Sequence, residues 1–217
     1  MNRPELRLVL AVSLDGRLAP AGGGAAQLGG AGDRRALEEA LVWADACLIG
    51  AQTLRLHGST CLIRQPELLA QRQAAGRPAQ PLAIVVSRSG RFAPALPFWS
   101  QPLERWLLQA QGPDLPPPPG FSRLLRWSTW PEALAPLAAA GIQRLVVLGG
   151  AQLAASLLAA DCLDALQLTV CPLLLGGAHH WLPSAGLPPQ GQGWRLEQCR
   201  PLGGEEVLLR YRRTPAL

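Results

Sequence analysis

The residues best suited to ligand chemistry lie where an apolar run meets two glycines, Gly149 and Gly150. The run Leu145 to Leu148 predicts a buried strand, and the small residues that follow the glycines predict a helix. Glycines let the backbone approach a ligand closely, and the free N–H groups at a helix start suit phosphate oxygens. The segment therefore predicts either a phosphate-binding turn or a glycine turn that serves packing alone.

A second candidate follows the apolar run 82–86, which also reads as a buried strand. The next five residues are Ser87-Arg88-Ser89-Gly90-Arg91, and they combine two hydroxyls with two guanidinium groups. Both groups bind phosphate well, and the carboxyl end of a strand is where α/β proteins commonly bind ligands. A solvated turn without a ligand is the alternative interpretation of this string.

The other reactive side chains form no recognisable acid–base or metal constellation. Asp15 precedes Gly16 in a turn-forming string, where an aspartate is either catalytic or a partner for turn backbone. His179 and His180 are adjacent, without a carboxylate or cysteine at ligand spacing. The five cysteines are widely spaced and include no Cys-x-x-Cys pair, so we expect neither a metal site nor a disulfide framework. No catalytic residue is assigned from the sequence.

Composition restricts the class of protein further. The chain has 217 residues, 48% hydrophobic and 16% charged, which is typical of a globular protein. Its net charge is +5, and every basic residue is arginine. The lack of lysine excludes Schiff-base chemistry and the usual P-loop. The scattered charge favours an anionic small molecule over nucleic acid, and the apolar start is too short for a signal peptide or membrane span, which fits the cytoplasm.

The remaining pattern predicts one α/β domain over residues 1–217. Further strands are expected at 6–12, 47–49, 105–109, 123–127 and 163–170, and a closing hairpin at 194–198 and 205–212. Helices are expected at 34–44, early in 66–81 and at 132–140. Asp33 is the expected N-cap of the first helix. The Gly- and Ala-rich residues 19–32 are either a disordered surface segment or a mobile flap over a site.

Three blocks of the sequence resemble a known family. They are Ala11-Val-Ser-Leu-Asp-Gly-Arg-Leu-Ala19, Ala44-Asp-Ala-Cys-Leu-Ile-Gly-Ala-Gln-Thr53, and Leu148-Gly-Gly-Ala-Gln-Leu-Ala-Ala-Ser-Leu-Leu158 continuing to Asp164 and Pro172–Gly177. In this order they resemble the reductase domain of the bacterial bifunctional riboflavin-biosynthesis deaminase–reductase, which has a dihydrofolate-reductase-like fold. The zinc-deaminase pattern of the bifunctional enzyme, His-x-Glu followed by Pro-Cys-x-x-Cys, does not occur in this sequence.

The resemblance implies a fold and a reaction. The fold is a three-layer α/β structure with a mixed, mostly parallel sheet, helices on both faces and a C-terminal antiparallel hairpin. The implied cofactor is NADPH, which transfers hydride to the ribose C1 of a phosphorylated ribosylaminopyrimidine and opens the sugar to a ribityl chain. The family also implies a homodimer.

The resemblance further implies roles for individual residues. Thr53 would lie beside the cofactor, and Ser87, Arg88 and Ser89 would lie at the 2′-phosphate. Arg64 would bind the substrate phosphate, since a guanidinium can bind phosphate through two hydrogen bonds. The cofactor pyrophosphate would lie on the segment that contains Gly149, Gly150, Ala151, Gln152, Leu153 and Ser156.

The substrate side of the pattern departs from the family. Leu148 replaces the usual acidic residue before the glycine pair, and His57 stands where the family has aspartate. Both positions remain substrate-side candidates. Two alternatives therefore stay open beside a riboflavin-pathway reductase. One is a reductase of the same fold that acts on another pterin- or pyrimidine-like compound, and the other is a non-catalytic nucleotide-binding relative.

Overall fold

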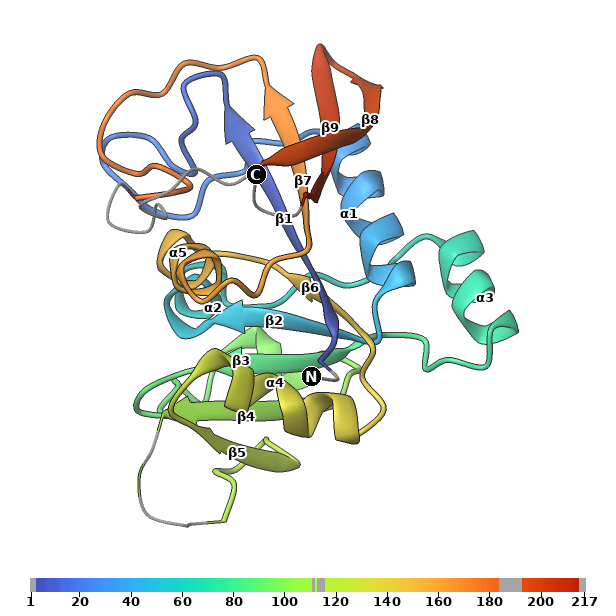
Figure 1. Cartoon of the computed structure of the whole chain (residues 1–217), viewed down its shortest axis with the longest axis vertical. Coiled ribbons are helices and arrows are strands. Elements are labelled where there is room, and N and C mark those ends of the chain that lie inside the picture. The colour runs from blue at the N-terminus through green and yellow to red at the C-terminus, as the bar shows by residue number, and fades with distance from the viewer. Residues whose placement is uncertain (1–2, 111, 113–115, 184–192, 215–217) are drawn as a thin grey trace. The chain divides into compact units, whose positions relative to one another are not determined.

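The computed structural model describes residues 3–110, 112, 116–183 and 193–214. Within these residues the chain forms an α/β fold that divides into two compact units. The first unit takes its residues from 1–5 and 38–146, and the second from 6–37 and 147–217. The expected α/β class is confirmed, and Figure 1 shows the elements of each unit.

The first unit is built on parallel strands. Its strand order is β5-β4-β3-β2-β6. The bounds are β2 (Ala46–Gly50), β3 (Leu82–Val86), β4 (Arg105–Ala110), β5 (Arg123–Trp127) and β6 (Arg144–Val147). The helices are α2 (Ala51–His57), α3 (Pro66–Ala74) and α4 (Trp130–Ala139), with a 3₁₀ turn at Pro97–Ser100. Strands β2 to β5 pair in parallel, so their carboxyl ends meet at one edge.

The second unit ends in the expected antiparallel hairpin. Its strand order is β1-β7-β9-β8, with bounds β1 (Glu5–Ser13), β7 (Ala165–Cys171), β8 (Trp194–Gly203) and β9 (Glu206–Arg213). Strand β7 is parallel to β1, whereas β9 is antiparallel to both β7 and β8. The helices are α1 (Ala31–Trp43), which begins in this unit, and α5 (Ala151–Ala159).

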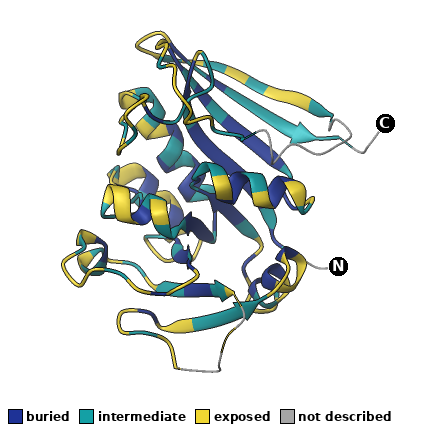
Figure 2. Cartoon of the chain, turned by 90° about the vertical axis from the view of Figure 1, so that its left-hand side faces the viewer, coloured by how far each residue is buried: buried dark blue, intermediate teal, exposed yellow. Residues whose placement is uncertain are grey.

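The two faces of β7, β9 and β8 are covered unequally. Gln167, Thr169 and Leu208 are buried on one face, where the Gln167 amide donates to the Ala36 carbonyl of α1 at 3.2 Å. Cross-strand partners share a face, so the opposite face carries apolar side chains. They include Leu168, Val170, Val207, Leu209, Tyr211, Leu196 and Pro201. Leu196 is 50% exposed, and Figure 2 shows the hairpin coloured mainly as intermediate and exposed.

Two helix expectations need correction. Residues 51–57 form helix α2, whereas the sequence predicted no helix there. The segment is only two turns long and begins at a glycine without a side-chain cap, so it carries none of the usual start signals. Helix α1 begins at Ala31, so Asp33 lies in its first turn and is not its N-cap.

The C-terminal end of α1 is stabilised by a buried arginine from α3. Arg72 is 1% exposed, and its guanidinium donates to the carbonyls of Leu41, Ala44 and Pro78 at 2.6–2.8 Å. The last carbonyls of a helix have no partner within the helix, and a positive charge there also suits the helix dipole. Burial lowers the pKa of Arg72.

We predict that Arg72→Met destabilises the protein by about 2–4 kcal/mol, because several buried carbonyls lose a charged donor at once. Arg77→Met is the matched control, since Arg77 donates to the neighbouring Val42 and Trp43 carbonyls but remains partly exposed. Its loss should stay below about 1 kcal/mol. Urea unfolding of the two variants measures the difference, and equal losses would contradict a special role for the buried guanidinium.

Candidate functional site

The turn after β3 holds three of the predicted cofactor residues in one rigid arrangement. The buried hydroxyl of Ser87 accepts the Gly90 N–H at 3.1 Å, and the Ser89 hydroxyl accepts the Arg91 N–H at 3.3 Å. The amide of Gln109 donates to the Arg88 carbonyl at 2.7 Å. Gly90 has φ +64°, and a Cβ there would lie 3.0 Å from Leu107, so this position requires glycine.

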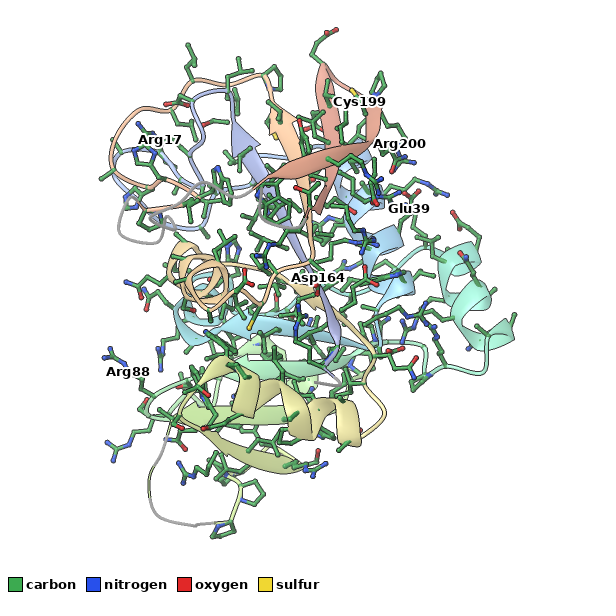
Figure 3. The ribbon with its side chains drawn as sticks, viewed as in Figure 1. Arg17, Glu39, Arg88, Asp164, Cys199 and Arg200 are labelled. Carbon is green, nitrogen blue, oxygen red and sulfur yellow. The ribbon has the colours of Figure 1, made fainter. Side chains whose placement is uncertain are left out.

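The Arg88 side chain is exposed on this turn. Only its carbonyl has a partner among the described residues, and Figure 3 shows the side chain pointing away from the ribbon. A guanidinium held on a fixed backbone and free to meet an anion is suited to a phosphate group. The structure is thus compatible with the phosphate-binding interpretation of this turn.

Helix α2 supports the same turn through a residue that the sequence did not single out. The Arg55 guanidinium donates to the Arg91 carbonyl at 2.9 Å and lies over the Phe92 ring at 5.0 Å. A cation over an aromatic face is attracted by the ring quadrupole. The sequence could have revealed this contact only if α2 had been predicted. Thr53 lies half-buried in the first turn of the same helix.

The glycine pair of the second unit connects β6 to α5 as expected. Gly149 has φ +80°, and a Cβ there would lie 2.8 Å from Leu10, so local packing already requires glycine. The Gly149–Gly150 peptide bond is cis. Helix α5 begins at Ala151 with Gly150 as N-cap, and no side chain caps it. The N–H groups of Ala151, Gln152 and Leu153 therefore have no acceptor within the helix.

Further along α5, Ser156 lies one turn beyond Gln152. Its hydroxyl donates to the Leu153 carbonyl at 2.9 Å. This hydroxyl is thus bonded to the helix backbone, which leaves the helix start as the part of this segment best suited to an anion.

The three predicted substrate residues lie apart in the chain. Arg64 is exposed just before α3, and its N–H and that of Gln65 donate to the buried Glu38 carboxylate at 2.9 and 3.0 Å. His57 is the exposed last residue of α2. Leu148 follows β6 in the second unit and is half-buried.

Asp15 binds turn backbone, as one of its two interpretations required. Its carboxylate accepts the Ser13 hydroxyl at 2.6 Å and the N–H groups of Leu175 and Gly176 at 3.1 and 2.8 Å. Arg17 lies 3.4 Å away from it and also contacts His180. These contacts join the loops that follow the parallel strands β1 and β7. The Ser13 hydroxyl first, and then the Leu175 N–H, lower the pKa of Asp15.

The described residues hold no group of three His, Cys, Asp or Glu side chains that could bind a metal ion. Nor does any helix in the described part of the chain have the length and apolarity needed to cross a membrane.

We predict that Asp15→Asn lowers the melting temperature at pH 7, because the amide cannot replace a carboxylate that accepts three hydrogen bonds. Because the pKa of Asp15 is lowered in the folded state, its charged carboxylate stabilises the protein above the unfolded pKa of about 4. This stabilisation is lost as the pH falls further. The difference between variant and wild type should therefore shrink below about pH 4. Thermal unfolding across pH measures it, with Glu205→Gln in an exposed turn as control. A difference independent of pH would contradict the role of the charge.

Comparisons with known proteins agree with the features above. The family model described as "RibD C-terminal domain" matches residues 4–208. A 2,5-diamino-6-ribosylamino-4(3H)-pyrimidinone 5′-phosphate reductase of Methanothermobacter thermautotrophicus is 25% identical over 96% of this chain and 98% of its own length.

Solved structures show the same fold. A pyrimidine reductase-like protein of Corynebacterium diphtheriae has a TM-score of 0.79 and 21% identity over 99% of this chain and 94% of its own. The deaminase/5-amino-6-(5-phosphoribosylamino)uracil reductase of Thermotoga maritima has a TM-score of 0.77 and 20% identity, and the match covers 98% of this chain and 57% of that one. The dihydrofolate reductase of Enterococcus faecalis, solved with NADP(H), has a TM-score of 0.52 and 14% identity over 97% of each chain.

The family match covers nearly the whole chain, and the structural likenesses confirm the expected dihydrofolate-reductase-like fold. The chain belongs to the RibD C-terminal domain family, the reductases of riboflavin biosynthesis.

Proposed function

We propose that this protein reduces 5-amino-6-(5-phosphoribosylamino)uracil, or its pyrimidine precursor, to the ribitylamino product with NADPH. The observation that carries the proposal is the family match over residues 4–208. The reaction moves a hydride from the cofactor to C1 of the sugar and a proton to the sugar oxygen, so that the ring opens. The cofactor supplies the hydride, and the protein binds and orients the two molecules.

The cofactor proposal rests on two features that suit phosphate groups. The uncapped start of α5 offers the N–H groups of Ala151, Gln152 and Leu153 for a pyrophosphate. The fixed turn 87–91 presents the exposed Arg88 guanidinium for a 2′-phosphate, with Ser87 and Ser89 in the same turn. The dihydrofolate reductase with this fold was solved with NADP(H), which supports the choice of cofactor.

The substrate proposal assigns the phosphate to Arg64. Its backbone is fixed by Glu38, while its side chain remains exposed for an anion. Leu148 and His57 lie at substrate-side positions of the family and differ from its usual carboxylates. This difference favours the second candidate function, a reductase of another pterin- or pyrimidine-like compound, over a non-catalytic relative, because the cofactor features are retained.

We also infer a homodimer that acts in the cytoplasm as a single reductase domain. The apolar face of β7, β9 and β8 supports it, because half-exposed Leu, Val and Tyr side chains favour burial against a second copy. The reaction needs neither nucleic acid nor a membrane, and the scattered arginines suit a phosphorylated small molecule.

The test of the proposed function is NADPH oxidation by the purified protein with freshly prepared substrate. The deaminated and non-deaminated pyrimidines are supplied separately. Turnover of either supports the reaction class, and the preferred form places the enzyme before or after the deamination. Tight NADPH binding without turnover of either pyrimidine would contradict the proposed substrate and favour the second candidate. Binding without turnover of any pterin- or pyrimidine-like compound would indicate a non-catalytic relative.

We predict that Arg88→Ala raises the KM for NADPH about tenfold or more, while the KM for NADH stays nearly unchanged. The reason is that only NADPH carries the 2′-phosphate, and a charge-assisted hydrogen bond is worth about 1.5–3 kcal/mol. Arg123→Ala is the control, because Arg123 lies exposed on β5 over the Trp106 ring. Equal weakening of both cofactors would rule out the assignment of Arg88.

We predict that light scattering gives a mass of two 23.1 kDa chains, and that Leu196→Arg shifts the mass toward one. A charge placed on the apolar face of the hairpin would have to be buried without a partner in the dimer. Arg195→Ala is the control, since Arg195 projects to the opposite face of β8. A wild-type protein that scatters as a single chain would exclude the dimer.

A further inference from the structure

The N-terminus of α1 is held by a side chain far along the sequence. Glu206 is the first residue of β9 and is 6% exposed. Its carboxylate accepts the Gly30 N–H at 2.5 Å through Oε1 and the Asp33 N–H at 3.3 Å through Oε2. It therefore does for α1 what an N-cap side chain does for other helices, which explains why the helix begins before Asp33.

The position of Glu206 in the sheet is fixed by strand register. Val207 pairs with Val170, so Glu206 lies beside Cys171 at the carboxyl end of β7. Cys171 in turn pairs with Ser13 at the carboxyl end of β1. Glu206 thus belongs to the edge of the sheet at which α/β proteins bind their ligands.

The glycines before and within the first turn of α1 lie close to the side chain of Glu206, to the hairpin backbone or to Asp33. A Cβ at Gly30 would lie 3.3 Å from Glu206 Oε1, and a Cβ at Gly32 would lie 2.1 Å from the Leu202 carbonyl. A Cβ at Gly29 would instead clash with the Asp33 side chain. The segment therefore approaches the hairpin most closely at Gly32, where a Cβ would clash with hairpin backbone.

A second carboxyl group lies close to the first. The Thr169 hydroxyl donates a hydrogen bond to the Asp33 carboxylate. Burial, and then the charge of Glu206, raises the pKa of Asp33, whereas the Thr169 hydrogen bond and the charge of Arg34 oppose this shift. Burial, Glu206 and Asp33 also raise the pKa of Cys171 to about 11. Glu206 is buried and Asp33 is half-buried, and the two acids lie together although their charges repel, because each is bonded to the segment or to the sheet beneath it.

We define the flap as residues 19–29. The end of the flap that follows β1 is fixed as well. The Leu18 N–H donates to the His179 carbonyl at 2.8 Å, and Arg17 contacts His180. From 20 to 29 the flap residues are exposed or half-buried. The flap is thus an exposed segment whose two ends are held at the carboxyl edge of β1 and β7.

We propose that Glu206 is a positioning residue for the reductase, and that it holds the flap in place over the pyrimidine substrate by accepting the Gly30 and Asp33 N–H groups. The inference rests on the proposed function. It assigns to the C-terminal hairpin, which supplies Glu206, control over the position of the flap.

The test compares Glu206→Ala and Glu206→Gln with the wild type in the full chain. Glu206→Ala should raise the KM for the pyrimidine about tenfold, because both charge-assisted hydrogen bonds are lost, and should leave the KM for NADPH unchanged. Amide hydrogen exchange at residues 18–34 should become faster. Glu206→Gln keeps one oxygen acceptor in a side chain of the same shape, so both effects should be smaller and the variant should remain folded.

Glu197→Gln is the matched control. Glu197 lies in the same hairpin, but its carboxylate pairs with Arg212 at 3.0 Å and Arg210 at 3.5 Å on the strand beside it. Its loss should alter neither the KM for the pyrimidine nor exchange in residues 18–34.

Three results would contradict the proposal. Unchanged exchange in both Glu206 variants would show that the carboxylate does not hold the flap. Faster exchange with an unchanged pyrimidine KM would show that the flap does not position the substrate. A wild-type enzyme that does not turn over the pyrimidine would overturn the proposed function itself, and the exchange experiment would still report separately on whether Glu206 anchors the flap.

Discussion

Buried and half-buried carboxylates that accept backbone N–H groups from distant segments are the interaction on which both units depend. Glu38 binds the N–H groups of residues 64 and 65, Asp45 binds those of 143 and 144, and Asp164 binds that of Leu6. Asp15 and Glu206 do the same for loops of the second unit. Hydrogen bonds from backbone N–H groups to a charged carboxylate are strong, and five of the 15 acidic residues of the chain fix distant segments in this way.

The parts of the structure that could be predicted from the sequence are those held by local contacts, whereas those held by distant side chains could not. The parallel strands and the closing hairpin follow from local apolar runs and turn residues, as in 82–86 and 145–148, and they were predicted close to their true bounds. The start of α1 could not be predicted, because its capping group is Glu206, 173 residues away from Asp33. Helix α2 was not predicted because it is short and uncapped. The contact of Arg55 with the turn after β3 was therefore not predicted either.

In the candidate site, too, the local residue strings could be predicted, whereas the contacts that hold them could not. Its local parts, the turn 87–91 and the glycine pair before α5, were visible as short strings of suitable residues. What the strings could not reveal is how those residues are held, because the Ser87 and Ser89 hydroxyls are used to shape the turn while the Arg88 guanidinium remains exposed. Asp15 could be assigned to backbone binding only when its partners at 175 and 176 were known. Family membership then supplies the reaction class that the side chains alone do not specify.

The most direct test of the account is transfer of deuterium from NADPH labelled at C4 of the nicotinamide, with each of the two labelled stereoisomers tried in turn. The account predicts that one isomer gives a ribitylamino product heavier by one deuterium at the former ribose C1, as mass spectrometry would show. Oxidation of the cofactor without deuterium in the pyrimidine product from both isomers would contradict hydride transfer to the sugar and with it the proposed function.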